Sequence, residues 1–180
     1  MKRIFSCLIA VILLLSFSFA YTVEESADVL VRLNLMKGYE DGSLRLENSI
    51  TRAEFCSLIV RMMKKEGTTP DTEIRFSDMK ETHWAFGTVL TAVSCGYLSG
   101  YADGTFKPSN SITYAETCAI LVNVLGYNAD ITGKWPTNVM QKAEELKLND
   151  GLQIEESSYK MTRGEVCVML VNALGAVPKK

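Results

Sequence analysis

The sequence of 180 residues has a single histidine, His83, and no excess of basic residues. With one imidazole, His-dependent catalytic triads and metal sites with several histidines are hard to assemble. No Cys-x-x-Cys pair occurs, so a structural zinc site is not indicated. The 19 basic residues are balanced by 21 acidic ones, which leaves no general basic surface for phosphates. We therefore expect no nucleic-acid partner, no metal and no cofactor.

Long apolar runs are also absent, except at the N-terminus. Residues 1–20 start with a basic pair, continue with an apolar run over 4–15 and end on small residues at 18 and 20. This order is typical of a secretory signal peptide that is cleaved after residue 20. The alternative is a transmembrane anchor, but the run is shorter than the ~20 residues that a span requires. We expect an exported chain without a membrane span, with 17 basic and 21 acidic residues left after cleavage.

The rest of the chain is organised by an internal repeat. A Thr-x-x-Glu pattern begins at residues 51, 113 and 162, in steps of 62 and 49 residues. The string Gly-Tyr-x-Asp-Gly occurs at 38–42 and again at 100–104, also 62 residues apart, and the third copy keeps only 149–151 of it. The sequence therefore predicts a shortened first repeat at 21–67, a second at 76–126 and a divergent third at 132–175.

Each repeat is expected to contain two helices joined by an Asp-Gly turn. The Thr-x-x-Glu pattern predicts a capping box, in which the threonine hydroxyl and the glutamate carboxylate satisfy backbone N–H groups of the first helical turn. Apolar residues follow at helical spacing, and amphipathic segments precede each turn at about 24–35, 85–95 and 137–146. Glycines at 67, 126 and 175 fit the helix ends. The six residues assigned to capping are Thr51, Glu54, Thr113, Glu116, Thr162 and Glu165.

Three cysteines share one position in the repeat. Cys56, Cys118 and Cys167 each follow the capping threonine by five residues, which favours a small side chain in the core. Cys95 has no counterpart in the other repeats. Secretion permits disulfides, so a bridge between two of the three equivalent cysteines near a threefold axis is the alternative.

The motifs of the second repeat resemble the S-layer homology family. They are Phe-Ser-Asp at 76–78, His-Trp-Ala at 83–85, the string from 96 to 108 and Ile-Thr-Tyr-Ala-Glu at 112–116. The resemblance implies a mainly α fold in which three helix-loop-helix repeats form a pseudo-threefold trident around a central three-helix bundle. It also implies non-covalent binding of secondary cell-wall polysaccharide, often through a pyruvate-ketal-bearing sugar, in grooves between repeats.

The family's pattern has an arginine after the capping threonine, and here Arg52 and Arg163 hold that place. An anion beside the first helical turn would meet the positive helix end, and a guanidinium can bind a carboxylate with two hydrogen bonds. The alternative is a solvated charge or a local ion pair. The second repeat has Tyr114 instead, which can stack on a sugar or donate one hydrogen bond. We therefore expect one or two working grooves rather than three.

Two tryptophans in equivalent places, Trp84 and Trp135, are the other candidate sugar contacts. The alternative is a ring that packs at a helix start, with its indole N–H bonded locally. Asp78 and Gly104 belong to the matched motifs and complete the candidate glycan-binding set. His83, beside Trp84, is expected to act mainly as a structural hydrogen-bonding group.

These residues bear on three classes of function. The leading interpretation is a non-catalytic module that anchors a protein to the bacterial cell wall. The alternative is a structural or interaction protein of the S-layer or outer envelope whose glycan binding has decayed, which Tyr114 and the eroded third loop would explain. An enzyme is disfavoured because the acidic residues form no recognisable catalytic pair outside capping and turn positions.

Overall fold

A computed structural model describes residues 21–68, 70 and 73–179. This part of the chain forms six α-helices and one short 3-10 turn, and its extended backbone occurs as isolated bridges, so the mainly α class is confirmed. The predicted signal peptide, 1–20, lies outside the described residues. Within them, no helix has the length and apolarity to cross a membrane. The helices are α1 Val23–Arg32, α2 Arg52–Met62, α3 Phe86–Ser94, α4 Tyr114–Val124, α5 Thr137–Glu145 and α6 Arg163–Gly175, with the turn η1 at Asn128–Asp130.

All three predicted capping boxes are formed, at the starts of α2, α4 and α6. In each, the threonine Oγ1 accepts the glutamate N–H at 3.2 Å. The glutamate Oε2 accepts the threonine N–H at 2.8–2.9 Å. A fourth box, Thr22 with Glu25, starts α1. It carries the same Thr-x-x-Glu signal, although Thr22 lies 62 residues before Trp84 and so holds the tryptophan position of the repeat.

The centre of the molecule is a closed cycle of three backbone hydrogen bonds. The N–H of Ile50 donates to the carbonyl of Met161, Met161 donates to Ile112, and Ile112 donates to Ile50, each at 3.0 Å. These three residues immediately precede the capped helices, and their side chains are completely buried. The segment before each helix is thereby tied to the other two, which gives the three repeats a common pseudo-threefold centre.

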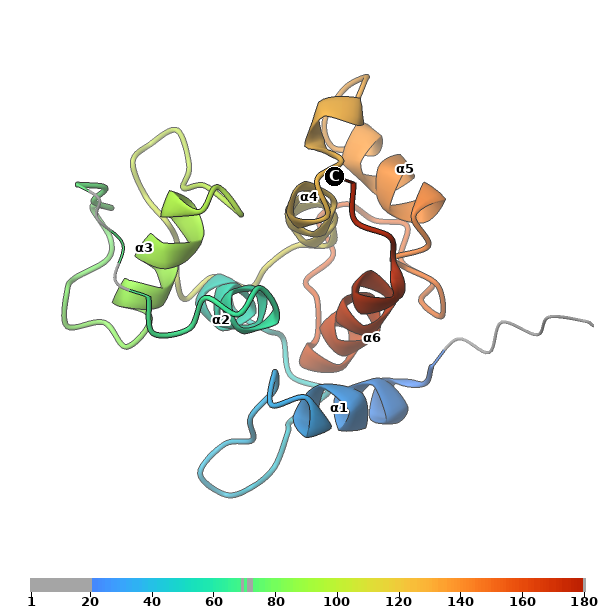
Figure 1. Ribbon diagram of the computed structural model, residues 1–180, viewed down its shortest axis with the longest axis horizontal. Coiled ribbons are helices and arrows are strands. Elements are labelled where there is room, and N and C mark those ends of the chain that lie inside the picture. Colours follow the sequence, from blue (N-terminus) through green and yellow to red (C-terminus); the bar gives the residue numbers. More distant parts are fainter. Residues whose placement is uncertain (1–20, 69, 71–72, 180) are drawn as a thin grey trace, which may run out of the picture.

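The helices pack in three pairs around this centre (Figure 1). Each capped helix packs mainly against the first helix of the following repeat, so α2 pairs with α3 and α4 with α5. The third pair is α6 with α1, which joins the end of the chain to its beginning. The capped helices contact one another much less, chiefly α4 with α6. The shared core thus lies within the pairs and at the bonded centre more than in a three-helix bundle.

Helix ends repeat in conformation although their residues differ. A left-handed residue follows the helices at equivalent places: Asn34, Lys64, Gly96, Gly126 and Lys147, with φ between 54° and 85°. The predicted stop at Gly67 was wrong, because α2 ends at Met62 and Lys64 adopts the left-handed turn. Gly175 is the last residue of α6 rather than a stop beyond it. Only one glycine of the three predicted, Gly126, follows its helix as expected.

The cysteines of the described residues are free thiols. The three equivalent ones are buried, as predicted, but they face different helix pairs. Cys56 Sγ lies 3.9 Å from the Thr88 carbonyl on α3, and Cys167 Sγ lies 3.4 Å from Met36 Sδ. Burial raises the pKa of all three thiols to about 12. The alternative of a bridge near the threefold axis is therefore not what the structure shows.

Candidate functional site: two grooves between repeats

Two equivalent grooves lie where one repeat meets the next. We define the first groove by Tyr39, Glu54, Trp84 and Arg163, and the second groove by Tyr101, Glu116, Trp135 and Arg52. In each, the tyrosine comes from the Gly-Tyr-x-Asp-Gly loop and the glutamate from the capping box of the same repeat. The arginine comes from the preceding repeat in the ring and the tryptophan from the following one. Three repeats therefore contribute to each groove.

The second groove is built around a buried guanidinium. Arg52 Nε donates to the Phe106 carbonyl at 3.0 Å and Nη2 donates to the Ser99 carbonyl at 3.2 Å. Nη1 lies 3.5 Å from Glu116 Oε1, and the guanidinium carbon lies 4.7 Å from the centre of the Tyr101 ring. Only 6% of the arginine side chain is exposed. The contacts join the first repeat to the loop of the second.

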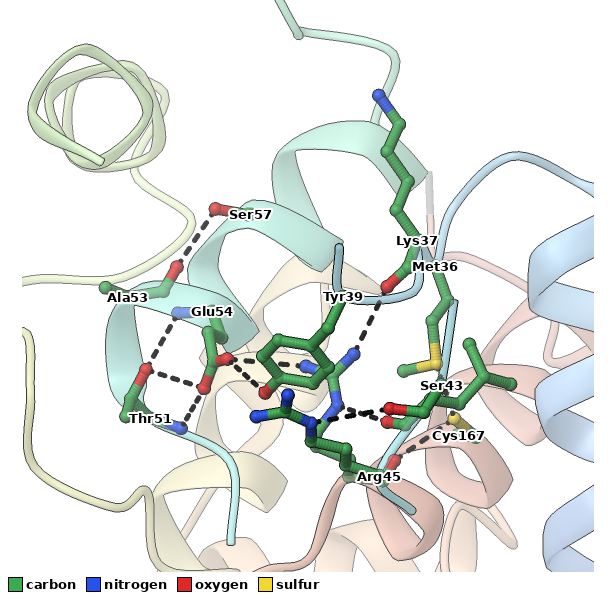
Figure 2. A network of polar contacts seen from close by, with 12 residues as sticks. Met36, Lys37, Tyr39, Ser43, Arg45, Thr51, Ala53, Glu54, Ser57 and Cys167 are labelled. Atoms are coloured by element: carbon green, nitrogen blue, oxygen red, sulfur yellow. Dashed lines mark hydrogen bonds and ion pairs between the residues drawn. The ribbon is translucent and has the colours of Figure 1, made fainter. Parts of the chain in front are cut away.

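The first groove repeats this geometry with Arg163. Its Nε donates to the Leu44 carbonyl at 2.8 Å, Nη2 donates to the Lys37 carbonyl at 3.3 Å and Nη1 lies 3.5 Å from Glu54 Oε1. Figure 2 shows the Glu54 carboxylate between Thr51 and the Tyr39 hydroxyl. The Arg45 guanidinium lies over the Tyr39 ring. The alternative of a local ion pair therefore describes both arginines, although the pairs are buried rather than solvated.

The glutamate of each groove has two functions. One carboxylate oxygen caps its helix, and the other accepts the tyrosine hydroxyl and faces the arginine. Burial, followed by the hydrogen bond to Glu116, raises the pKa of Tyr101 to about 12. Burial alone would raise the pKa of Glu116, but hydrogen bonds from Tyr101 and the Thr113 backbone and the charge of Arg52 lower it. At neutral pH the second groove thus holds a neutral phenol and a paired carboxylate.

The two grooves differ in how their space is divided. The second encloses about 560 Å³ between α4, the end of α3 and Trp135, with Asn123 and Asn128 at its wall. The first has a hollow of about 130 Å³ beside Arg163 and Lys37. A second hollow of about 460 Å³ lies on the other side, lined by polar groups that include Ser49, Ser109 and His83. The two hollows of the first groove share Tyr39, Glu54 and Trp84.

Both tryptophans are among the most exposed large side chains of the described residues. Trp84 is 65% exposed and Trp135 is 58% exposed, and each lines its groove. The alternative of a ring packed at a helix start does not fit these values. His83 stacks against Trp84 with 5.7 Å between ring centres, and its Nδ1 accepts the Ala85 N–H. An aromatic face held open over a polar hollow is an arrangement that suits the apolar face of a sugar ring.

The helix N-termini do not offer free N–H groups, contrary to the expectation from the arginine position. The first two helical N–H groups of α2 donate to the carbonyls of Asn110 and Pro108, at 2.9 and 3.1 Å. The first two of α6 donate to those of Asn48 and Leu46, at 2.9 Å. The third N–H is held by the capping threonine. An anionic ligand must therefore use side chains of the groove rather than the helix end.

The third interface between repeats lacks the parts of the other two. Tyr114, in the arginine place, is only 2% exposed, so its ring offers no face to a ligand. Thr22 stands where the other grooves have tryptophan, and its hydroxyl caps α1. Tyr159 supplies the phenol, which donates to Glu165 at 2.9 Å. The interface keeps the bond that joins loop and capping glutamate, but it has neither guanidinium nor exposed indole.

Two other candidate residues lie outside the groove walls. Asp78 accepts the backbone N–H groups of Phe106 and Lys107, at 2.8 and 2.7 Å, and so anchors the loop of its own repeat. Gly104 has φ 77° and forms the turn of that loop. Neither belongs to the lining of the second groove. The sequence-based prediction did not include Tyr39 and Tyr101. Their equal position in the two Gly-Tyr-x-Asp-Gly strings was the signal that could have indicated them.

The described part of the chain holds no cluster of histidine, cysteine and carboxylate side chains that could bind a metal. The fold is therefore a module built from repeats, which buried arginines join and which leave grooves at their junctions. Residues 24–56 and 75–118 match the model of the S-layer homology domain, and the chain belongs to this family through these two segments. The third repeat is not included in that match.

Several similar proteins are surface proteins by name, and others are glycoside-degrading enzymes. The chain is 35% identical over 154 residues to the middle cell wall protein of Brevibacillus brevis, and 32% identical over 154 residues to a surface layer protein of Brevibacillus choshinensis. Each alignment covers 84% of this chain and 14% of the relative. A cellulosome-anchoring protein of Acetivibrio thermocellus is 40% identical over 91 residues, which cover 49% of this chain and 20% of that protein. The chain thus spans only 14–20% of the length of these relatives.

Proposed function

We propose that this chain is a non-catalytic module that holds a protein at the bacterial cell wall by binding secondary cell-wall polysaccharide in its two grooves. The observation that carries the proposal is the pair of exposed indoles, each held over a hollow whose wall presents a tyrosine, a glutamate and an arginine. The names of the relatives, which include a cell wall protein and an anchoring protein, support the same location. The two buried arginines keep the groove in shape, and the tryptophans contact the sugar.

Exposed residues make this proposal testable without unfolding the protein. A double variant, Trp84→Ala with Trp135→Ala, removes both rings from solvent-exposed positions, where substitutions usually change stability by less than about 0.5 kcal/mol. We expect its retention on Gram-positive sacculi to fall by at least about tenfold, which corresponds to ~1.4 kcal/mol of lost contact. Each single variant should lose part of the binding.

Two controls separate sugar binding from other causes. Tyr21→Ala removes another exposed aromatic ring, 50% exposed and outside both grooves, and should leave retention unchanged. Sacculi treated with hydrofluoric acid, which strips the polymer from peptidoglycan, should no longer retain the wild-type chain. Undiminished retention on stripped sacculi would contradict the binding of the polysaccharide by the grooves.

A further inference from the structure

Residues 176–179, which we call the strap, leave their helix differently from the chain after the other two capped helices. The residues 13 positions after the capping threonines are Lys64, Gly126 and Gly175. Lys64 and Gly126 form left-handed turns at φ 54° and 85°, whereas α6 runs through Gly175. Ala176 follows in an extended conformation, at φ −73° and ψ 151°. The chain therefore continues away from α6 and reaches the end of α4 (Figure 1).

Three polar contacts hold the strap on the segment that follows α4. The N–H of Lys179 donates to the Leu125 carbonyl at 2.9 Å. The Tyr127 hydroxyl donates to the Val177 carbonyl, also at 2.9 Å. The Lys179 ammonium group forms an ion pair with Asp130. Since Tyr127 precedes the turn η1 and Asp130 is its last residue, the strap holds this turn at both ends.

The approach of the strap is closest at Gly126. A Cβ at this position would lie 2.7 Å from the Lys179 carbonyl oxygen, which is too close for a side chain. The left-handed turn alone does not explain the glycine, because Lys64 makes the same turn at the equivalent place after α2. We therefore attribute Gly126 to the close passage of the strap.

The turn that the strap holds belongs to the wall of the second groove. Asn128, the first residue of η1, lines this groove together with Trp135, which follows a few residues later. Residues 176–179 do not line the groove themselves, so they act on it only through η1. Among the described residues, the lining of both hollows of the first groove includes neither η1 nor the strap. The two grooves thus differ in their dependence on this segment.

We propose that the strap positions the wall of the second groove, so that docking of the strap and binding of polysaccharide there favour each other. The inference rests on the proposed function and concerns the regulation of one of its two sites. If the groove binds only while the strap is docked, detachment lowers its apparent affinity in proportion to the docked fraction. Linkage makes the effect reciprocal, so a ligand in the second groove holds the strap in place by the same factor.

Deletion of residues 177–180 tests the coupling one groove at a time. The deletion is made in Trp84→Ala, which keeps the second groove, and in Trp135→Ala, which keeps the first. In the Trp84→Ala chain we expect the concentration for half-maximal retention on sacculi to rise about fivefold, the lower end of typical coupling between sites. In the Trp135→Ala chain the deletion should change nothing. Thermal melts of both chains show whether the fold is kept.

Point variants give the same test with a smaller change to the chain. Tyr127→Phe removes one hydrogen bond to the strap, and Gly126→Ala places a Cβ against it. Both should weaken the second groove, by less than the deletion does. The matched control is Gly67→Ala, which has a similar φ of 77° but open space around its Cβ, so it carries the backbone cost without touching the strap.

The reciprocal effect is measured on the strap itself. Amide hydrogen exchange of Lys179, whose N–H is bonded to Leu125, is followed by NMR with and without polysaccharide released from the same sacculi by hydrofluoric acid. Saturating polysaccharide should slow this exchange about fivefold in the Trp84→Ala chain, as the linkage requires. In the Trp135→Ala chain, which binds through the first groove, the exchange rate should stay the same.

The possible failures are distinguishable. If the deletion leaves retention of the Trp84→Ala chain unchanged, or weakens both chains equally, the positioning role of the strap is overturned and the proposed function stands. The same conclusion follows if polysaccharide binds the Trp84→Ala chain without slowing exchange at Lys179. If the wild type is not retained on sacculi, the proposed function falls, and this inference with it.

Discussion

The buried guanidinium of Arg163 should contribute more to stability than any exposed charge of the chain. Replacing it with alanine removes two hydrogen bonds to carbonyls, one ion pair with Glu54 and a contact 4.8 Å from the Tyr39 ring centre. The carbonyls of Leu44 and Lys37 and the Glu54 carboxylate lose their partner. Breaking one side of a buried ion pair costs about 3–5 kcal/mol.

Such a loss is large for a chain of this length. Since 1 kcal/mol shifts the melting temperature of a domain this size by about 2–4 °C, we expect Arg163→Ala to melt roughly 6–20 °C below the wild type. Arg52→Ala should behave in the same way, because its contacts are equivalent. Circular dichroism melts and urea titrations measure both. The matched control is Arg45→Ala, in the loop that Arg163 contacts. The ion pair of Arg45 with Asp41 is exposed, so its loss should cost less than about 1 kcal/mol.

A small loss of stability in Arg163→Ala would refute the structural role of this guanidinium. If Arg163→Ala melted within 2–3 °C of Arg45→Ala, the guanidinium would not hold the repeats together. That result would support the alternative that Arg163 contacts the ligand directly. If it melts far lower, loss of wall binding in an arginine variant reports unfolding and cannot locate the ligand. The tryptophans are then the residues on which binding should be tested.

Three further predictions concern closure, chemistry and pH. Gly164→Ala places a Cβ 2.4 Å from Val23 Cγ1 where α6 meets α1, so we expect a loss of about 1–3 kcal/mol in urea unfolding that Val23→Ala restores. Cys95, which is exposed, should be the only thiol of residues 21–179 to react quickly with a maleimide in the native protein, because the other three are buried. The lowered pKa of Glu116 means that its carboxylate stabilises the fold above its ordinary pKa and stops doing so as pH falls through the lowered value. Stability should therefore decline below about pH 4, and Glu116→Gln should lower stability at neutral pH and flatten that decline.

Local features could be read directly from the residues. Each Thr-x-x-Glu makes its capping box, the amphipathic segments are helical within a few residues of the expected bounds, and the three equivalent cysteines are buried. These features depend on groups that are three to five positions apart in the chain. The same rule finds the box at Thr22, which the spacing of the three repeats does not mark.

The helix ends show where local rules fail. Asn34, Lys64 and Lys147 adopt left-handed turns that a sequence reading assigns to glycine. Their strain is of the order of 1 kcal/mol and is outweighed by packing of the helix and loop on either side. A glycine that was present nearby, Gly67, then misled the prediction of where α2 ends.

The sequence by itself determined the repeat, its capped helices and the family, because these follow from spacing along the chain. The tertiary structure alone decided what the two arginines that follow the capping threonines do. Arg52 and Arg163 become buried ties between repeats, since the loop carbonyls and glutamates that surround them come from residues 47 to 126 positions away. It also left the two indoles exposed to solvent, because exposure depends on which distant segments fill the space around a side chain.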